Sequence, residues 1–73
     1  MMVLDIRSEK QSLLAGRVRH ALTGGAKRPR EMAVLVRSAD DEQVVQYLAE
    51  LSGYRTTCPM GPGSRILVLR KAA

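Results

Sequence analysis

The fold is determined by residues 32–42, MAVLVRSADDE, in the middle of the 73-residue chain. The five consecutive apolar residues Met32–Val36 are typical of a strand that is buried on both faces of a sheet. Ser38 or Asp40 is suited to cap a helix, and the three acids that begin at Asp40 would lie in its first turn, where the helix dipole favours negative charge. The stretch therefore predicts a strand that leads directly into a helix.

The residues that follow predict the body of this helix and two more strands. The apolar stripe that would face the core comprises Val44, Leu48 and Leu51, with Val45 and Tyr47 beside it. Gly53 would end the helix, because glycine adopts the left-handed conformation of a C-cap without strain. Residues 54–58 have the composition of a short strand, residues 59–63 that of a turn, and residues 65–70 predict the final strand.

The residues before the stretch predict a first strand and a first helix. Residues 3–7 largely alternate apolar and polar, as a half-buried strand does. Ser8 is a candidate N-cap for a helix over about residues 9–22. The core-facing residues of that helix would be Leu14, Val18 and Leu22. The two glycines after Thr23 would end it, ahead of a basic loop over residues 26–31.

The resulting order βαβαββ predicts one domain, residues 1–73, with a two-layer α/β sandwich architecture. Right-handed strand–helix–strand crossovers would place both helices on one face of a four-stranded mixed sheet. The strands over residues 32–36 and 66–69 are apolar at every position, so apolar side chains would also reach the open face. As protein-contact residues there we expect Ala33 and Leu35, next to either Ile66 and Val68 or Leu67 and Leu69.

Composition restricts the class of protein. The chain has a single cysteine, Cys58, so an internal disulfide framework is excluded. Its first residues lack the pattern of a signal peptide, and no apolar run approaches the roughly 20 residues that span a bilayer. A cytoplasmic protein without a membrane partner is therefore expected. The one histidine, His20, has no clustered ligands around it in the sequence, so we expect neither a metal site nor a cofactor.

The net charge of +5 is concentrated in the first half of the chain. The densest group of basic residues consists of Arg17, Arg19, Lys27, Arg28 and Arg30. This group could bind the phosphates of a nucleic acid or an acidic protein partner. RNA is the less favoured of the two, because no aromatic residue accompanies the group to stack on bases.

Several short motifs, taken in order, resemble the TusA/SirA-like family of small sulfur-carrier proteins. The matching segments are Leu4-Asp5-Ile6-Arg7, Asp40-Asp41, Gly53-Tyr54 and Leu69-Arg70-Lys71. The resemblance extends from Leu4 to Lys71 and implies a sheet whose first three strands run in one direction. It also implies that a cysteine desulfurase or a sulfur-relay protein is the partner.

The chain departs from that family at its defining motif. The family carries Cys-Pro-x-Pro at the start of the first helix, where this sequence has Gln11, Ser12, Leu13 and Leu14. The residue that would carry a persulfide is therefore absent from that position. Cys58 is the alternative nucleophile, at the end of a predicted strand and with Arg55 and Arg65 close in sequence to stabilise a thiolate.

Three hypotheses follow. The first is a degenerate TusA/SirA-like protein that acts without catalysis as a partner-binding or sulfur-trafficking accessory, through the open sheet face or the rim that carries Cys58. Homodimerisation through that sheet face is a further expectation. The second is a sulfur carrier that uses Cys58, the one case in which an enzymatic role is expected. The third is a basic RNA-binding module on the similar fold of the C-terminal domain of initiation factor 3.

Overall fold

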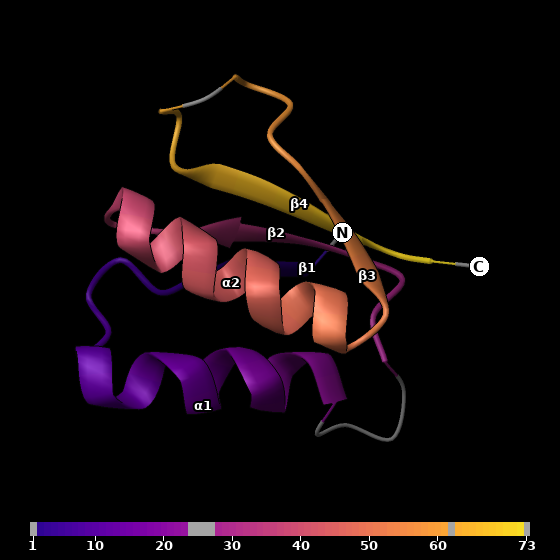
Figure 1. Ribbon diagram of the computed structural model, residues 1–73, viewed down its shortest axis with the longest axis horizontal. Coiled ribbons are helices and arrows are strands. Elements are labelled where there is room, and N and C mark those ends of the chain that lie inside the picture. Colours follow the sequence, from indigo (N-terminus) through magenta and orange to yellow (C-terminus); the bar gives the residue numbers. More distant parts are fainter. Residues whose placement is uncertain (1, 24–27, 62, 73) are drawn as a thin grey trace.

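The computed structural model describes residues 2–23, 28–61 and 63–72 and confirms the order βαβαββ (Figure 1). The elements are β1 (Met2–Asp5), α1 (Gln11–Thr23), β2 (Glu31–Leu35), α2 (Ala39–Leu51), β3 (Tyr54–Thr57) and β4 (Ile66–Lys71). The two glycines predicted to end the first helix, Gly24 and Gly25, and the basic residue Lys27 lie outside the described residues.

The four strands form one mixed sheet in the order β1-β2-β4-β3. β1 is parallel to β2, and β4 is antiparallel to both of its neighbours, β2 and β3. The strands β1, β2 and β3 therefore all run in one direction, and their C-terminal ends share one rim of the sheet. Both helices cover the same face, so the predicted two-layer arrangement is confirmed (Figure 1).

Alternation along the strands separates the core from the open face. Met32 and Val34 of β2 and Leu67 and Leu69 of β4 are buried under the helices. The remaining core residues are Leu4, Ile6, Leu14, Val18, Leu22, Val36, Val45, Ala49 and Tyr54. The core is therefore almost wholly aliphatic. The intervening residues face away from the helices, and the open face thus combines Ala33 and Leu35 with Ile66 and Val68.

The buried face of α2 differs from the predicted one. Its buried residues are Asp41, Val45 and Ala49, whereas Val44 and Leu48 are only partly buried and Leu51 is 68% exposed. Two apolar stripes lie next to each other on this helix, and periodicity alone does not distinguish them. The stripe with the smaller residues, Val45 and Ala49, faces the core, since small side chains allow a helix to approach its neighbours closely. The predicted stripe was therefore displaced by one residue around the helix.

The two helix starts also differ in how well they were predicted. Ser38 caps α2 as expected, in an extended conformation and with its Oγ accepting the Asp41 N–H at 3.2 Å. The first helix begins at Gln11, two residues later than predicted, after a turn in which the Glu9 N–H donates to the Ile6 carbonyl at 3.2 Å. Ser8 is exposed and lies three residues before the first residue of the helix, so its predicted role as N-cap was wrong.

Candidate functional site

The centre of the open sheet face is apolar. Val3, Ala33 and Val68 are register partners across β1, β2 and β4, and Leu35 and Ile66 form the next row. Val3 is 61% exposed, and the other four side chains are partly exposed because no layer covers them. These five residues, Val3, Ala33, Leu35, Ile66 and Val68, are called the apolar patch below. An uncovered patch of this kind on a small protein is typical of a contact surface.

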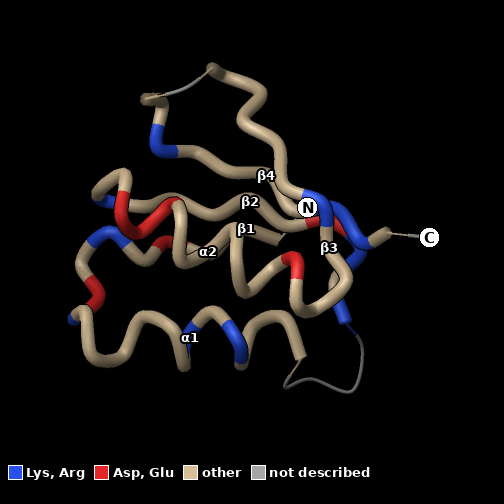
Figure 2. The backbone as a smooth tube through the Cα atoms, viewed as in Figure 1, with Lys and Arg blue, Asp and Glu red and all other residues tan. Residues whose placement is uncertain are grey.

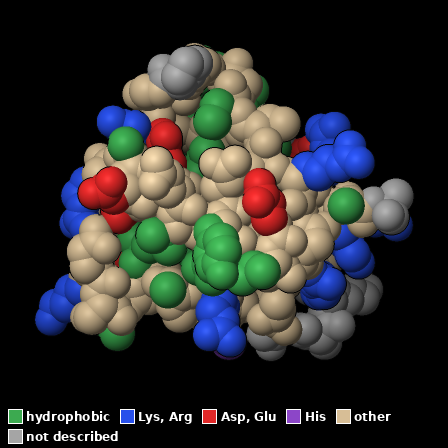
Figure 3. All heavy atoms as spheres, viewed as in Figure 1, with side chains coloured by type: hydrophobic (Ala, Val, Ile, Leu, Met, Phe, Trp, Pro, Cys, Tyr) green, Lys and Arg blue, Asp and Glu red, His purple; other side chains and the backbone are tan. Residues whose placement is uncertain are grey.

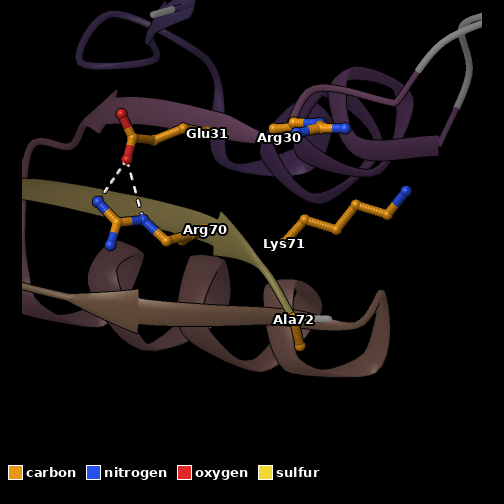
Figure 4. A pocket seen from close by; sticks show the side chains of 5 residues that line it. All are labelled: Arg30, Glu31, Arg70, Lys71 and Ala72. Atoms are coloured by element: carbon orange, nitrogen blue, oxygen red, sulfur yellow. Dashed lines mark hydrogen bonds and ion pairs between the residues drawn. The ribbon is translucent and has the colours of Figure 1, made fainter.

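One end of the same face carries two cations, Arg55 and Arg70, and one acid, Glu31. Glu31, Arg70 and Arg55 follow one another across β2, β4 and β3 in direct register. The Arg70 guanidinium donates to Oε2 of Glu31 from Nε at 3.0 Å and from Nη2 at 2.6 Å (Figure 4). Arg55 has no such partner among the residues that the structure describes, and it lies directly opposite the like charge of Arg70. Like charges at opposed positions destabilise a sheet.

Two adjoining surface grooves run past this end of the sheet. One is lined by Arg30, Glu31, Arg70, Lys71 and Ala72, and the other by Arg55, Thr57, Arg70, Lys71 and Ala72. The Lys71 N–H donates to the Arg30 carbonyl at 2.7 Å, which places these two cations on adjacent chain segments. Figure 4 shows their side chains extending in the same direction, away from the Glu31–Arg70 pair. The four cations Arg30, Arg55, Arg70 and Lys71 form what is called the basic rim (Figure 2).

The predicted basic group is thus divided in the structure. Arg30 belongs to the basic rim, whereas Arg17 and Arg19 are exposed on α1. Arg28 stabilises the fold instead of lying free on the surface. Its Nε donates to the Leu22 carbonyl at 3.3 Å, and its Nη2 donates to the Ser52 carbonyl. The other residues of the basic rim are Arg55, Arg70 and Lys71, which the sequence analysis did not assign to a basic site. Alternation along the last two strands could have placed Arg55 and Arg70 together on the open face, once their register was known. It gives no signal for Lys71, which shares the face of Leu69 and Tyr54.

Tyr54 anchors the segment that leads into the basic rim. Its ring is 2% exposed, and the Arg28 guanidinium lies over it at 5.3 Å from the centroid. Its hydroxyl donates to the Pro29 carbonyl at 2.5 Å. Because the ring is buried under Arg28, it is not a surface on which a nucleic-acid base can stack.

Cys58 lies on the opposite rim, where β3 ends. The residue is exposed and begins a turn in which its carbonyl accepts the Gly61 N–H at 2.9 Å. Gly61 has φ +91°, a conformation that other residues rarely adopt. Of the two arginines expected to stabilise a thiolate, Arg65 pairs with Glu42 at 3.2 Å and Arg55 belongs to the basic rim. Within the described part of the chain, neither guanidinium forms a hydrogen bond to the sulfur.

Gln11 occupies the position at which the resembled family has its nucleophile, and here it has a structural role. The Gln11 side chain donates from Nε2 to Oδ1 of Asp41 at 2.7 Å, which joins the starts of α1 and α2. Asp41 is fully buried, and its Oδ2 lies 3.7 Å from Nη2 of Arg37. An amide and a buried carboxylate offer no nucleophile for carrying sulfur, so Gln11 helps to hold the two helices together.

Across residues 2–23, 28–61 and 63–72, His, Cys, Asp and Glu nowhere form a group of three that could hold a metal ion. In the same ranges both helices are too short and too polar to cross a membrane. No protein-family model, curated protein or solved structure matches the chain.

Proposed function

We propose that this chain is a non-catalytic binding protein that holds an acidic partner protein on its open sheet face. The observation that carries the proposal is that the apolar patch shares the uncovered face of the sheet with Arg55 and Arg70, while Arg30 and Lys71 lie at the same end of the sheet. Protein interfaces combine an apolar centre with a polar border, and arginine is enriched in them. Such a surface fits a partner with an apolar contact region beside carboxylates.

The internal pairing of the basic rim supports a binding role. Arg70 is held by two hydrogen bonds to Glu31, so its guanidinium is oriented before any partner arrives. A side chain that is ordered in advance loses less conformational entropy on binding. Arg55 lies opposite Arg70, forms no ion pair with a described residue, and so places two like charges together, which lowers stability. A partner carboxylate would relieve this repulsion on binding.

The resemblance to TusA/SirA-like proteins refines the proposal. The common direction of β1, β2 and β3 is what that resemblance implies, and Gln11 occupies the position of the missing nucleophile. We accordingly propose an accessory of sulfur trafficking in the cytoplasm, which binds a cysteine desulfurase or a sulfur-relay protein without itself carrying sulfur.

The test begins with a photo-crosslinking amino acid at position 35, in the apolar patch, and at position 13 as a control on α1. A protein joined to the chain from position 35 but not from position 13, and identified by mass spectrometry, is then purified for binding measurements. Leu35→Glu, Arg55→Glu and Lys71→Glu should each weaken its binding by about tenfold or more. Lys10→Glu makes the same charge change on the opposite rim and should leave binding unaltered. Equal effects of all four variants would contradict the proposal.

A second candidate function rests on the exposure of Cys58. If this thiol carries sulfur, incubation with a cysteine desulfurase and cysteine should add the mass of one sulfur atom to the intact protein. That adduct should be absent from Cys58→Ser. An unmodified mass under conditions in which a genuine carrier is loaded would remove this candidate and leave the binding role intact.

The test of the basic rim also separates proteins from RNA. An unstructured RNA oligonucleotide should bind only weakly at low salt, because no exposed aromatic ring accompanies the four cations. Tight RNA binding that is lost in Arg30→Ala and Lys71→Ala would instead favour the RNA-binding hypothesis.

A further inference from the structure

The outer edge of β3 presents backbone groups that can pair with a further strand. Among the described elements, β3 pairs only with β4 and forms one edge of the sheet (Figure 1). The Ala72 N–H donates to the Gly53 carbonyl at 2.9 Å, so Gly53 and Ala72 are a hydrogen-bonded pair of the β3–β4 ladder. In an antiparallel ladder, such pairs alternate with pairs whose backbone groups point outward. The N–H and C=O groups of Tyr54 and Thr56 therefore point away from β4, toward the outer edge.

A row of charged side chains ends at this edge. On the open face, Glu31, Arg70 and Arg55 lie side by side on β2, β4 and β3. Glu31 is bonded to Arg70, and none of the salt bridges among the described residues includes Arg55. Figure 3 shows Lys and Arg side chains gathered on this side of the molecule, where β3 begins and β4 ends. A carboxylate at the next position, beyond β3, would complete a row in which each arginine has an acid beside it.

We propose that the acidic partner adds an extended strand to the outer edge of β3, with the carboxylate of an aspartate or glutamate beside Arg55. This arrangement rests on the proposed function, and it specifies the part of the partner that meets this end of the sheet. In strand addition, main-chain hydrogen bonds supply affinity, and they would form here to Tyr54 and Thr56. The side chain that meets Arg55 supplies specificity. The added strand also extends the open face that carries the apolar patch.

The other edge of the sheet and a second copy of the chain fit less well. The open-face residue at the end of β1 is Asp5, which would repel an acidic strand. The segment Tyr54–Thr57 contains no acid, so pairing of β3 with β3 of a second copy leaves Arg55 without a carboxylate in every register. β1 of a second copy would bring Asp5, but Arg7 already binds that carboxylate. Pairing of two different edges also generates rings or filaments instead of a closed dimer. An acidic strand of another protein is therefore the occupant.

A peptide selection tests this edge independently of the protein partner. Short random peptides displayed on phage are selected on the immobilised full chain at low salt. The enriched peptides should carry an acid among residues of high strand propensity, and they should bind Thr56→Pro about tenfold or more weakly than the unmodified chain. Proline removes the outward N–H and is tolerated at a sheet edge, and thermal unfolding checks that this variant is folded. Thr56→Val is the matched control, because it keeps the N–H and the branched side chain, and its binding should be unaltered.

Amide hydrogen exchange locates the bound peptide. In the free chain, the Thr56 N–H should exchange faster than those of Arg55 and Thr57, which point toward β4. A bound peptide should slow the exchange of Thr56 by about tenfold or more. Peptides that lack acids, that bind folded Thr56→Pro as tightly as the unmodified chain, or that leave the exchange of Thr56 unchanged would overturn the proposal. Failure to enrich any peptide would do the same.

Charge reversal tests the contact with Arg55. Arg55→Glu should weaken a selected peptide by about fivefold or more, and replacing the acid of the peptide with lysine should restore binding to this variant. Absence of that recovery would overturn the proposal, as would self-association of the free chain that Thr56→Pro abolishes. A protein that crosslinks from position 35 but binds Thr56→Pro normally would refute the added strand and leave the proposed function intact. Peptides that bind this edge without any protein crosslinked from position 35 would retain the edge site and refute the proposed function.

Discussion

Arg55 of β3 and Arg70 of β4 lie directly opposite each other on the open face of the sheet, with Glu31 of β2 on the far side of Arg70. Glu31 binds Arg70 through two hydrogen bonds, and no acid among the residues that the structure describes pairs with Arg55. A carboxylate at position 55 would complete an alternating row, but the chain has a cation there. The arrangement therefore lowers stability at a surface that we propose binds a partner, as is common where function and stability compete.

Arg55→Glu should consequently stabilise the fold while it weakens partner binding. Replacing a like-charge pair by an opposite one across two strands should raise the free energy of unfolding by roughly 0.5 kcal/mol, within a range of about 0.2–1 kcal/mol. Arg55→Gln, which removes the repulsion without adding a carboxylate, should give a smaller increase. Urea unfolding at low salt measures both values. A lower stability for Arg55→Glu would show that the positive charge is needed by the fold itself.

The cap of α2 provides a test of local structure. Ser38→Ala removes the acceptor of the Asp41 N–H and should lower the free energy of unfolding by about 1 kcal/mol. Ser8→Ala is the matched control, because Ser8 precedes α1 but is not seen to cap it. Its effect should stay below about 0.5 kcal/mol. Equal losses in the two variants would mean that α1 is capped by Ser8 in solution.

The sequence was sufficient to predict the order of the elements for physical reasons. A continuous apolar run such as that of β2, and a capping serine followed by acids such as Ser38, are each compatible with few local structures. The sequence did not predict which residues of β4 face outward. Ile66, Leu67, Val68 and Leu69 are all apolar, so no alternation of apolar and polar residues distinguishes the two faces of the strand. The rotation of α2 was mispredicted for a similar reason, because two apolar stripes adjoin on that helix.

The basic rim was harder to predict than the fold. Three of its four cations lie in β3 and β4, and the fourth, Arg30, directly precedes β2. Only the pairing of β3 with β4 places Arg55 opposite Arg70. Pairing register between distant segments does not follow from composition or local charge density. The local density instead pointed to Arg28, whose guanidinium is bound to backbone carbonyls, and to Arg17 and Arg19 on α1. A density of cations along the chain was thus a poor guide to their arrangement in space.

A pH dependence is expected at the exposed Asp5–Arg7 pair. The side-chain hydrogen bonds from Arg7, at 2.8 and 3.0 Å, together with the bond from its backbone N–H, lower the pKa of Asp5 from 3.8 to about 2. Because the folded-state pKa is depressed, the stabilisation is present above pH 3.8 and is lost as the pH falls through about 2. Carbon-detected NMR titration should report this pKa directly.

The corresponding variant is Asp5→Asn. Its melting temperature should lie below that of the unmodified protein at neutral pH, and the difference should shrink between about pH 4 and pH 2. Added salt should also reduce the difference, since both side chains are exposed. A difference that is constant across this pH range would show that the pair does not contribute in solution.

The exposure of Cys58 predicts its chemical accessibility. Iodoacetamide should modify this thiol in the native protein at nearly the rate found in urea, because no unfolding step is needed to reach it. Cys58→Ser should leave the melting temperature almost unchanged. Modification that is slow in the native state and fast in urea would show that the turn from Cys58 to Gly61 closes over the sulfur.

The last prediction concerns Tyr54, which uses its hydroxyl and its ring for different contacts. Tyr54→Phe removes only the bond to the Pro29 carbonyl and should lower the free energy of unfolding by about 1 kcal/mol. Tyr54→Leu also removes the ring beneath Arg28, where a cation–π contact contributes about 0.5–1 kcal/mol.

Double variants with Arg28→Ala separate the two contacts. The stability losses of Tyr54→Phe and Arg28→Ala should be close to additive, because the ring remains in the Phe variant. The Leu variant should show a coupling energy of about 0.5–1 kcal/mol with Arg28→Ala. Urea unfolding of the three single and two double variants measures both couplings. Additivity in both cycles would mean that Arg28 is held by the Leu22 and Ser52 carbonyls alone and gains nothing from the ring.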